Sequence, residues 1–110
     1  MDKTIQLLEF IKESPHDPFL HYALTMEYVK AEDFEKAKQG FENLVQNFPD
    51  YVGTYYHFGK LLEKLNNKSA AEEIYNRGIL IASQQRKMHA KGELMGALNM
   101  LKGFDDDDDY

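Results

Sequence analysis

Residues 52–83 read VGTYYHFGKLLEKLNNKSAAEEIYNRGILIAS, and this stretch decides the fold because it repeats the stretch before it. The two copies align without a gap when Pro15 is set on Pro49. The period of about 34 residues is typical of stacked helical repeats, in which each repeat is one supersecondary unit. The matched positions are Pro15/Pro49, Tyr22/Tyr56, Leu24/Phe58, Ala37/Ala71, Phe41/Tyr75, Leu44/Gly78 and Val45/Ile79.

Each copy predicts a pair of helices. Apolar residues of the first copy recur at helical spacing, and Asp33 is a candidate N-cap before a second apolar run, with Glu35 in its first turn. Pro49 ends that run, whereas Asn66 and Asn67 form the turn inside the second copy. With the flanking segments, we predict six helices, over residues 4–13, 19–31, 34–47, 52–65, 68–83 and 86–102.

The flanking helices follow from the same register. Leu7, Phe10 and Ile11 fall one repeat period before Phe41, Leu44 and Val45, so residues 4–13 take the place of a second helix. This helix is expected to cover the outer apolar edge of the array. Residues 86–102 are expected to close the other end through four apolar side chains: Leu94, Ala97, Leu98 and Leu101.

This pattern resembles the tetratricopeptide repeat family over about residues 18–85. The first copy matches at His21, Leu24, Thr25, Tyr28, Ala37, Phe41, Leu44 and Pro49, and the second at Tyr55, Phe58, Gly59, Leu62, Ala71, Tyr75 and Gly78. The small residues Ala37, Gly59, Ala71 and Gly78 are expected where paired helices approach closely. The departures are His21 and Tyr55 in place of tryptophan, Glu32 in place of a turn glycine, and Ser83 in place of a final proline. Without that proline, the fifth helix is expected to run on.

The resemblance implies an all-α fold, a right-handed superhelical array of antiparallel helix hairpins with about six helices. We expect one domain over residues 1–103, with full repeats at about 18–51 and 52–85, followed by an acidic tail at 104–110. The family resemblance also implies a non-catalytic scaffold or adaptor that binds another protein.

Composition narrows the class of protein. A chain of 110 residues with 43% hydrophobic residues can form one packed core, and without cysteine it cannot use disulfides. The net charge of −6 owes much to Asp105–Asp109, and no basic stripe suggests nucleic-acid binding. No signal peptide or membrane span is visible, which favours the cytoplasm.

The expected binding surface is the concave side, lined by the first helix of each repeat. Gly53 stands where the first repeat has Phe19, which suggests a pocket or a close backbone contact. The apolar members are expected to supply affinity and the lysines to set the register of the bound segment. The candidate groove residues are Phe19, Tyr22, Met26, Val29, Gly53, Tyr56, Lys60 and Lys64.

The family resemblance also suggests an anion contact. Some tetratricopeptide domains hold the C-terminal carboxylate of acidic chaperone tails with basic and amide side chains. Here Tyr22 and Met26 occupy the first half of that clamp, so the usual chaperone-tail binding is not expected. A weaker anion contact remains open at His57, Lys87 and Lys91, together with Lys60.

The Asp-rich tail, flanked by Phe104 and Tyr110, has two open interpretations. It is a solvated segment that aids solubility, or a ligand for the basic middle of a groove. Its acids lack the spacing and glycine turn of a calcium loop.

No catalytic motif, cofactor signature or helical histidine pair is present, so neither an enzyme nor a metal site is predicted. The alternative to an adaptor is a homodimer that packs end to end or through the first helix, which carries Ile5, Leu7, Leu8, Phe10 and Ile11. The sequence does not name the partner.

Overall fold

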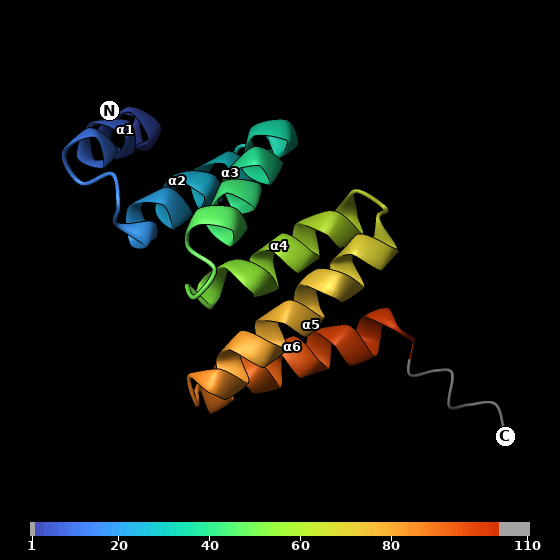
Figure 1. Cartoon of the computed structure of the whole chain (residues 1–110). Coiled ribbons are helices and arrows are strands. Elements are labelled where there is room, and N and C mark those ends of the chain that lie inside the picture. Colours follow the sequence, from blue (N-terminus) through green and yellow to red (C-terminus); the bar gives the residue numbers. More distant parts are fainter. Residues whose placement is uncertain (1, 104–110) are drawn as a thin grey trace, which may run out of the picture. The chain divides into compact units, whose positions relative to one another are not determined.

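The computed structural model describes residues 2–103, which form the six predicted helices (Figure 1). The chain divides into two compact units, with the boundary between Tyr51 and Val52. The single domain over residues 1–103 and the bounds of the two repeats stay predictions. Observed and predicted helix ends agree within two residues. The helices are α1 (Lys3–Glu13), α2 (Pro18–Lys30), α3 (Phe34–Asn47), α4 (Gly53–Lys64), α5 (Lys68–Gln84) and α6 (Met88–Leu101).

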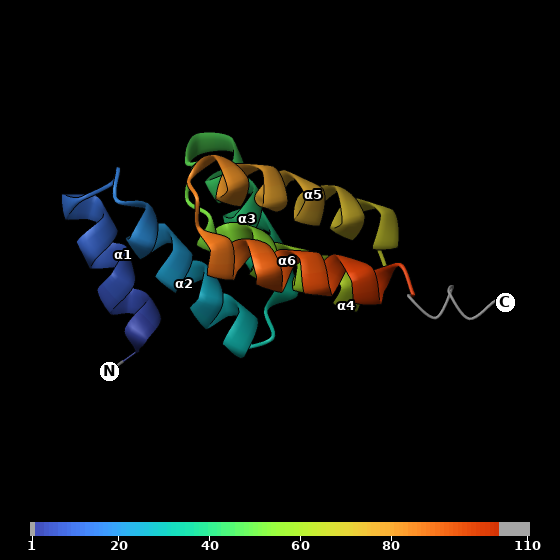
Figure 2. The same cartoon turned by 90° about the horizontal axis from the view of Figure 1, so that it is seen from below.

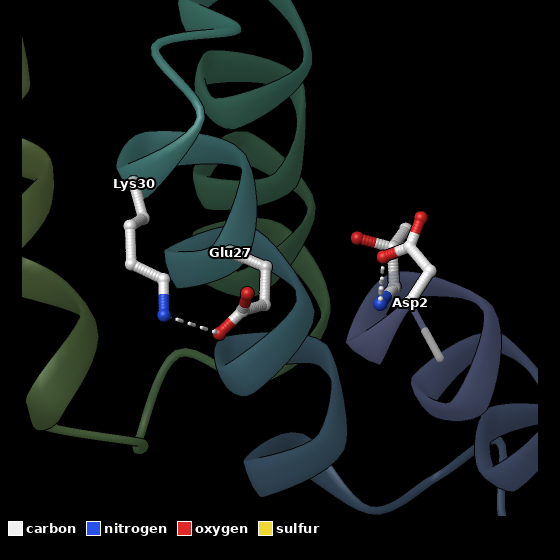
Figure 3. A network of polar contacts seen from close by, with 4 residues as sticks. Asp2, Glu27 and Lys30 are labelled. Carbon is white, nitrogen blue, oxygen red and sulfur yellow. Dashed lines mark hydrogen bonds and ion pairs between the residues drawn. The ribbon is translucent and has the colours of Figure 1, made fainter.

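Short polar side chains begin four of the helices. Asp2 accepts a hydrogen bond from the Thr4 N–H at 2.9 Å, as Figure 3 shows, and Asp17 accepts one from Phe19 at 3.0 Å. Asp33 caps α3 as predicted, and Asn67 caps α5 in the same way. These bonds satisfy backbone donors that a helix leaves unpaired, so the sequence itself fixes where these helices start.

Three helices end in one recurring turn. Glu32, Asn66 and Arg86 adopt left-handed backbone conformations, with φ of 61°, 63° and 58°. In each turn the next residue donates its N–H to a carbonyl five positions back, for example from Asp33 to Tyr28 at 2.9 Å. This pattern is a Schellman motif, which usually carries glycine at the left-handed position. Asn66 therefore behaves as predicted, and Glu32 takes the family glycine's conformation despite its side chain.

The N-terminal unit packs α1 on α2 and α2 on α3. Its core lies mainly on α3, where Ala37, Phe41 and Leu44 are fully buried. On α2 the buried residue is Thr25. The two helices meet at Gly40, where an added Cβ would lie 2.2 Å from Thr25 Oγ1. Gly40 is thus a close-approach position in addition to the predicted ones.

The C-terminal unit packs α4 on α5 and α5 on α6, with a smaller contact between α4 and α6. Figures 1 and 2 both show α5 and α6 lying side by side. An added Cβ at Gly59 would lie 2.2 Å from the Tyr75 ring, and one at Gly78 would lie 2.5 Å from Tyr55 Cβ. The predicted close approach of the paired helices at these glycines is confirmed.

The closing helix departs from the register of the two repeats. Leu94 and Ala97 are buried on α6, whereas the residues one repeat period earlier, Lys60 and Glu63, are exposed or half-buried. A slightly longer spacing instead aligns Leu94 with Phe58 and Ala97 with Leu61, both buried. The cause is α5, which has 17 residues against 14 in α3 because no proline stops it. The expected continuation past Ser83 is therefore confirmed.

Candidate functional site

The predicted binding residues lie on the first helix of each repeat: four on α2 in the N-terminal unit and four on α4 in the C-terminal unit.

On α2, the predicted residues form a partly open apolar surface. Phe19 is 56% exposed in the first turn, and Tyr22, Met26 and Val29 are half-buried. The Tyr22 ring lies 5.5 Å from the ring of Tyr51. Burial raises the pKa of Tyr22, and the neighbouring Tyr51 raises it further, so its hydroxyl is a neutral hydrogen-bonding group at physiological pH. The surface is amphipathic, as suits a protein contact.

Lys30, the last residue of α2, lies at the C-terminal end of this apolar surface. Its ammonium lies 3.6 Å from a carboxylate oxygen of Glu27, one turn earlier, as Figure 3 shows. The lysine is largely exposed, and exposed pairs of this kind add little stability. The pair therefore leaves the net charge at this end of α2 near zero.

On α4, an aromatic side chain and two lysines share one side of the helix. Tyr56 is half-buried, and the Lys60 ammonium lies 5.7 Å from the centre of its ring. The cation and the ring face attract each other at this distance. Lys64 is exposed one turn later, and Gly53 is the first residue of the helix. This set combines an aromatic surface with positive charge.

The candidate anion contact also lies in the C-terminal unit. His57 is half-buried on α4, and burial lowers its pKa, although Glu93 on α6 acts in the opposite direction. His57 is therefore neutral at pH 7 and offers a hydrogen bond rather than a charge. Lys87 is the exposed N-cap residue of α6, and Lys91 is half-buried on the same helix. Anion binding by these residues stays a prediction.

A hollow of about 340 Å³ lies between α2 and α3 in the N-terminal unit, and the sequence analysis did not foresee it. Leu24 and Tyr28 line it as half-buried residues. The Lys36 ammonium lies 5.6 Å from the Tyr28 ring, and Gln39 and Asn43 complete the polar side. No pattern in the sequence marked this hollow, because Tyr28 and Lys36 meet only when α2 packs on α3.

A buried hydrogen bond in the second repeat was also missed. Tyr75 is fully buried and donates its hydroxyl proton to Glu63 on α4. Burial raises the pKa of Tyr75, and the hydrogen bond to Glu63 raises it further. The aligned positions of the first repeat are Phe41 and Val29. This joint change of two aligned positions was visible in the sequence.

Residues 2–103 contain no helix of the length and apolar character that crossing a bilayer requires. The same residues bring together no group of three or more side chains suited to hold a metal ion. The predicted acidic tail at 104–110 lies outside the described residues.

Comparison with known proteins identifies the family. The tetratricopeptide repeat model matches residues 28–93. The crystal structure of a tetratricopeptide repeat domain protein from Salinibacter ruber is 41% identical, with a TM-score of 0.77, over 80% of this chain and 99% of that one. A solution structure of such a domain from the same organism is 42% identical, with a TM-score of 0.78, over 81% of this chain and 90% of that one.

A third structure shares the fold alone. The solution structure of a Bordetella parapertussis protein is 20% identical, with a TM-score of 0.80, over 96% of this chain and 91% of that one. No curated protein matches the sequence. The predicted all-α, tetratricopeptide-like fold is confirmed, and the chain belongs to the tetratricopeptide repeat family.

Proposed function

We propose that this protein is a non-catalytic adaptor that binds a peptide or helix of a partner protein through the first helices of its repeats. Tetratricopeptide domains are protein–protein interaction modules, which supports the general role. We further propose that the contact residues are those predicted on α2 and α4 and that the protein acts in the cytoplasm.

The observation that carries the proposal is the open apolar surface on the predicted side of α2. Phe19 is 56% exposed there, close in sequence to the half-buried Tyr22. Aromatic side chains dominate the energetics of protein interfaces because they bury a large area with few rotatable bonds. Phe19 and Tyr22 are thus suited to anchor a partner.

The charges on α4 indicate the chemistry of the bound segment. Lys60 and Lys64 are exposed at one-turn spacing beyond Tyr56. A segment with an apolar anchor followed by acidic residues would complement this set, and the charges would mainly set orientation and association rate. The chain's own tail has this composition, so it remains a candidate competitor.

Affinity capture from native cell extract tests the proposal, with wild type compared with Tyr22→Ala, Tyr56→Ala and the double variant. A partner retained by wild type and lost by the double variant supports it, and the single variants report on each helix. Tyr28→Ala is the matched control, since Tyr28 is a half-buried tyrosine that lines the α2/α3 hollow. If all variants retain the same proteins, the proposed contact residues are wrong.

A further inference from the structure

The first and last helices of the described residues, α1 and α6, both expose apolar side chains. Arrays normally end in helices with a polar outer face, because the stacking surface would otherwise stay open. Here α1 has no buried residue, and it exposes Ile5, Leu8 and Phe10. On α6, Met88 and Met95 are exposed by 64% and 44%.

Phe10 lies on the side of α1 that corresponds to the side a second helix turns toward its own first helix. Phe10 lies one repeat period before Leu44 and two periods before Gly78. Leu44 is fully buried, and Gly78 lies against Tyr55 of α4, its first helix, and against Leu94 of α6. Phe10 is nevertheless 55% exposed. Within the described residues, α1 therefore has the position of a second helix without a first helix to cover it.

The uncovered side of α6 is the complementary one. In the register that aligns Leu94 with Phe58, Lys91 corresponds to Tyr55 and Met95 to Gly59. Tyr55 and Gly59 are the residues of α4 that face α5, at Gly78 and Tyr75 respectively. Both are buried, whereas Met95 is 44% exposed and Lys91 is half-buried. Within the described residues, α6 therefore has the position of a first helix, and no second helix covers the side that corresponds to the α5-facing side of α4.

We propose that α1 of a second copy packs on this side of α6, so that two copies associate head to tail. Each helix exposes the side that the other type of helix covers within a repeat, so the pair reproduces the packing of a second helix on a first helix. By analogy with the Gly59–Tyr75 contact, Leu7 of the second copy lies opposite Met95, and Phe10 lies beside Lys91.

The side chains at this contact make the association weak. Neither helix carries a small residue at the matched positions, so the helix axes lie farther apart than those of α4 and α5. The flexible methionine and the aliphatic stem of lysine fill the wider space. An interface of two helix faces lies at the small end of protein contacts. Self-association is therefore expected to depend on concentration.

Head-to-tail contact leaves one end open on each partner, so it extends into longer oligomers or closes into a ring. Sedimentation equilibrium from micromolar to millimolar concentration should give a wild-type mass that rises above the monomer value of 12.8 kDa. Phe10→Glu and Met95→Glu should each stay monomeric, since each variant blocks one side of the contact. A wild type that is monomeric throughout would overturn the proposal.

Mixing the two variants is the decisive step. The Phe10→Glu chain keeps an intact α6 and the Met95→Glu chain keeps an intact α1, so the mixture should form dimers and stop there. If Met95→Glu alone still associates, or if the mixture stays monomeric, the contact is not head to tail and the proposal is wrong.

A matched control uses Leu80 on α5, which is 58% exposed and lies on neither helix of the contact. Leu80→Glu should associate like wild type, and helical circular dichroism should show that all variants fold. The Tyr22→Ala, Tyr56→Ala variant should also associate like wild type. Self-association and partner binding can therefore be tested independently, because they depend on different residues.

Discussion

The two repeats make a close helix contact at the same position of the first helix, but the glycine of that contact lies on opposite helices. In the first repeat, Gly40 on the second helix receives Thr25 from the first. In the second repeat, Gly59 on the first helix receives the ring of Tyr75 from the second. The position that aligns with Gly59 is Thr25 itself. A repeat therefore requires one small partner at this contact, but the period alone does not decide which helix supplies it.

The repeats also differ at the position of Tyr75, whose ring makes this contact in the second repeat. The second repeat pairs a buried tyrosine hydroxyl with Glu63, whereas the first places Phe41 and Val29 at the aligned positions. A buried hydroxyl requires an acceptor, and a phenylalanine at the same place requires none. The two positions thus change together because the hydrogen bond needs both partners.

The largest expected effect is at Gly59. In Gly59→Ala the new methyl would lie 2.2 Å from the buried Tyr75 ring, which is rigid and cannot move aside. We expect a loss of about 3 kcal/mol in the free energy of unfolding, measured by urea denaturation. Gly92→Ala is the control, because its added Cβ meets nothing within 4 Å. That change should stabilise the helix by up to about 1 kcal/mol. Equal effects at the two glycines would contradict the close approach.

Gly40→Ala should cost less, about 2 kcal/mol, because the clash is with the small Thr25 side chain. Thr25→Ala removes the two nearest atoms, Oγ1 and Cγ2, so Gly40→Ala should become nearly neutral in that background. A double-mutant cycle measures this coupling. If the two changes add independently, the Thr25–Gly40 contact does not hold the first repeat together.

The smallest effect concerns the Tyr75–Glu63 pair. Tyr75→Phe should cost about 1–2 kcal/mol, since the partly buried Glu63 loses its donor. Adding Glu63→Val recreates the pair found in the first repeat and should recover most of the loss. If Glu63→Val alone also stabilises the wild-type protein, the glutamate is simply unfavourable at this position and the two residues are not coupled.

The pH dependence sharpens the same comparison. The folded protein raises the pKa of Tyr75, so its contribution to stability is complete below about pH 10, the ordinary tyrosine pKa. At higher pH the unfolded chain loses this proton first, and stability falls by up to about 1.4 kcal/mol per pH unit. Wild type should therefore lose more stability than Tyr75→Phe above pH 10. Parallel curves for the two proteins would contradict the assignment.

The helix ends and the repeat were predictable because they depend on neighbours in the chain. Asp33 caps its own helix, and Asn66 takes a left-handed turn conformation that asparagine tolerates. The register of α6 was not predictable from the period. It follows from how far α5 extends, which gives Leu94 the buried position of Phe58 rather than the exposed position of Lys60.

The candidate site shows the same division. Aromatic and basic residues at helical spacing predicted one side of α2 and one side of α4 as contact surfaces, but the partners of these residues within each unit come from elsewhere in the fold. The contact of Tyr22 with Tyr51 and the placement of Tyr28 in a hollow with Lys36 depend on chain segments that meet only after folding.

The sequence by itself determined the family, the six helices, their caps and the two-repeat period, because these depend on local spacing and side-chain type. Only the tertiary structure decided which helix carries each small residue's partner, where Tyr75 finds its acceptor, and which sides of α1 and α6 stay uncovered. Those features depend on the distances between helices, which are set by packing in three dimensions rather than by the order of residues along the chain.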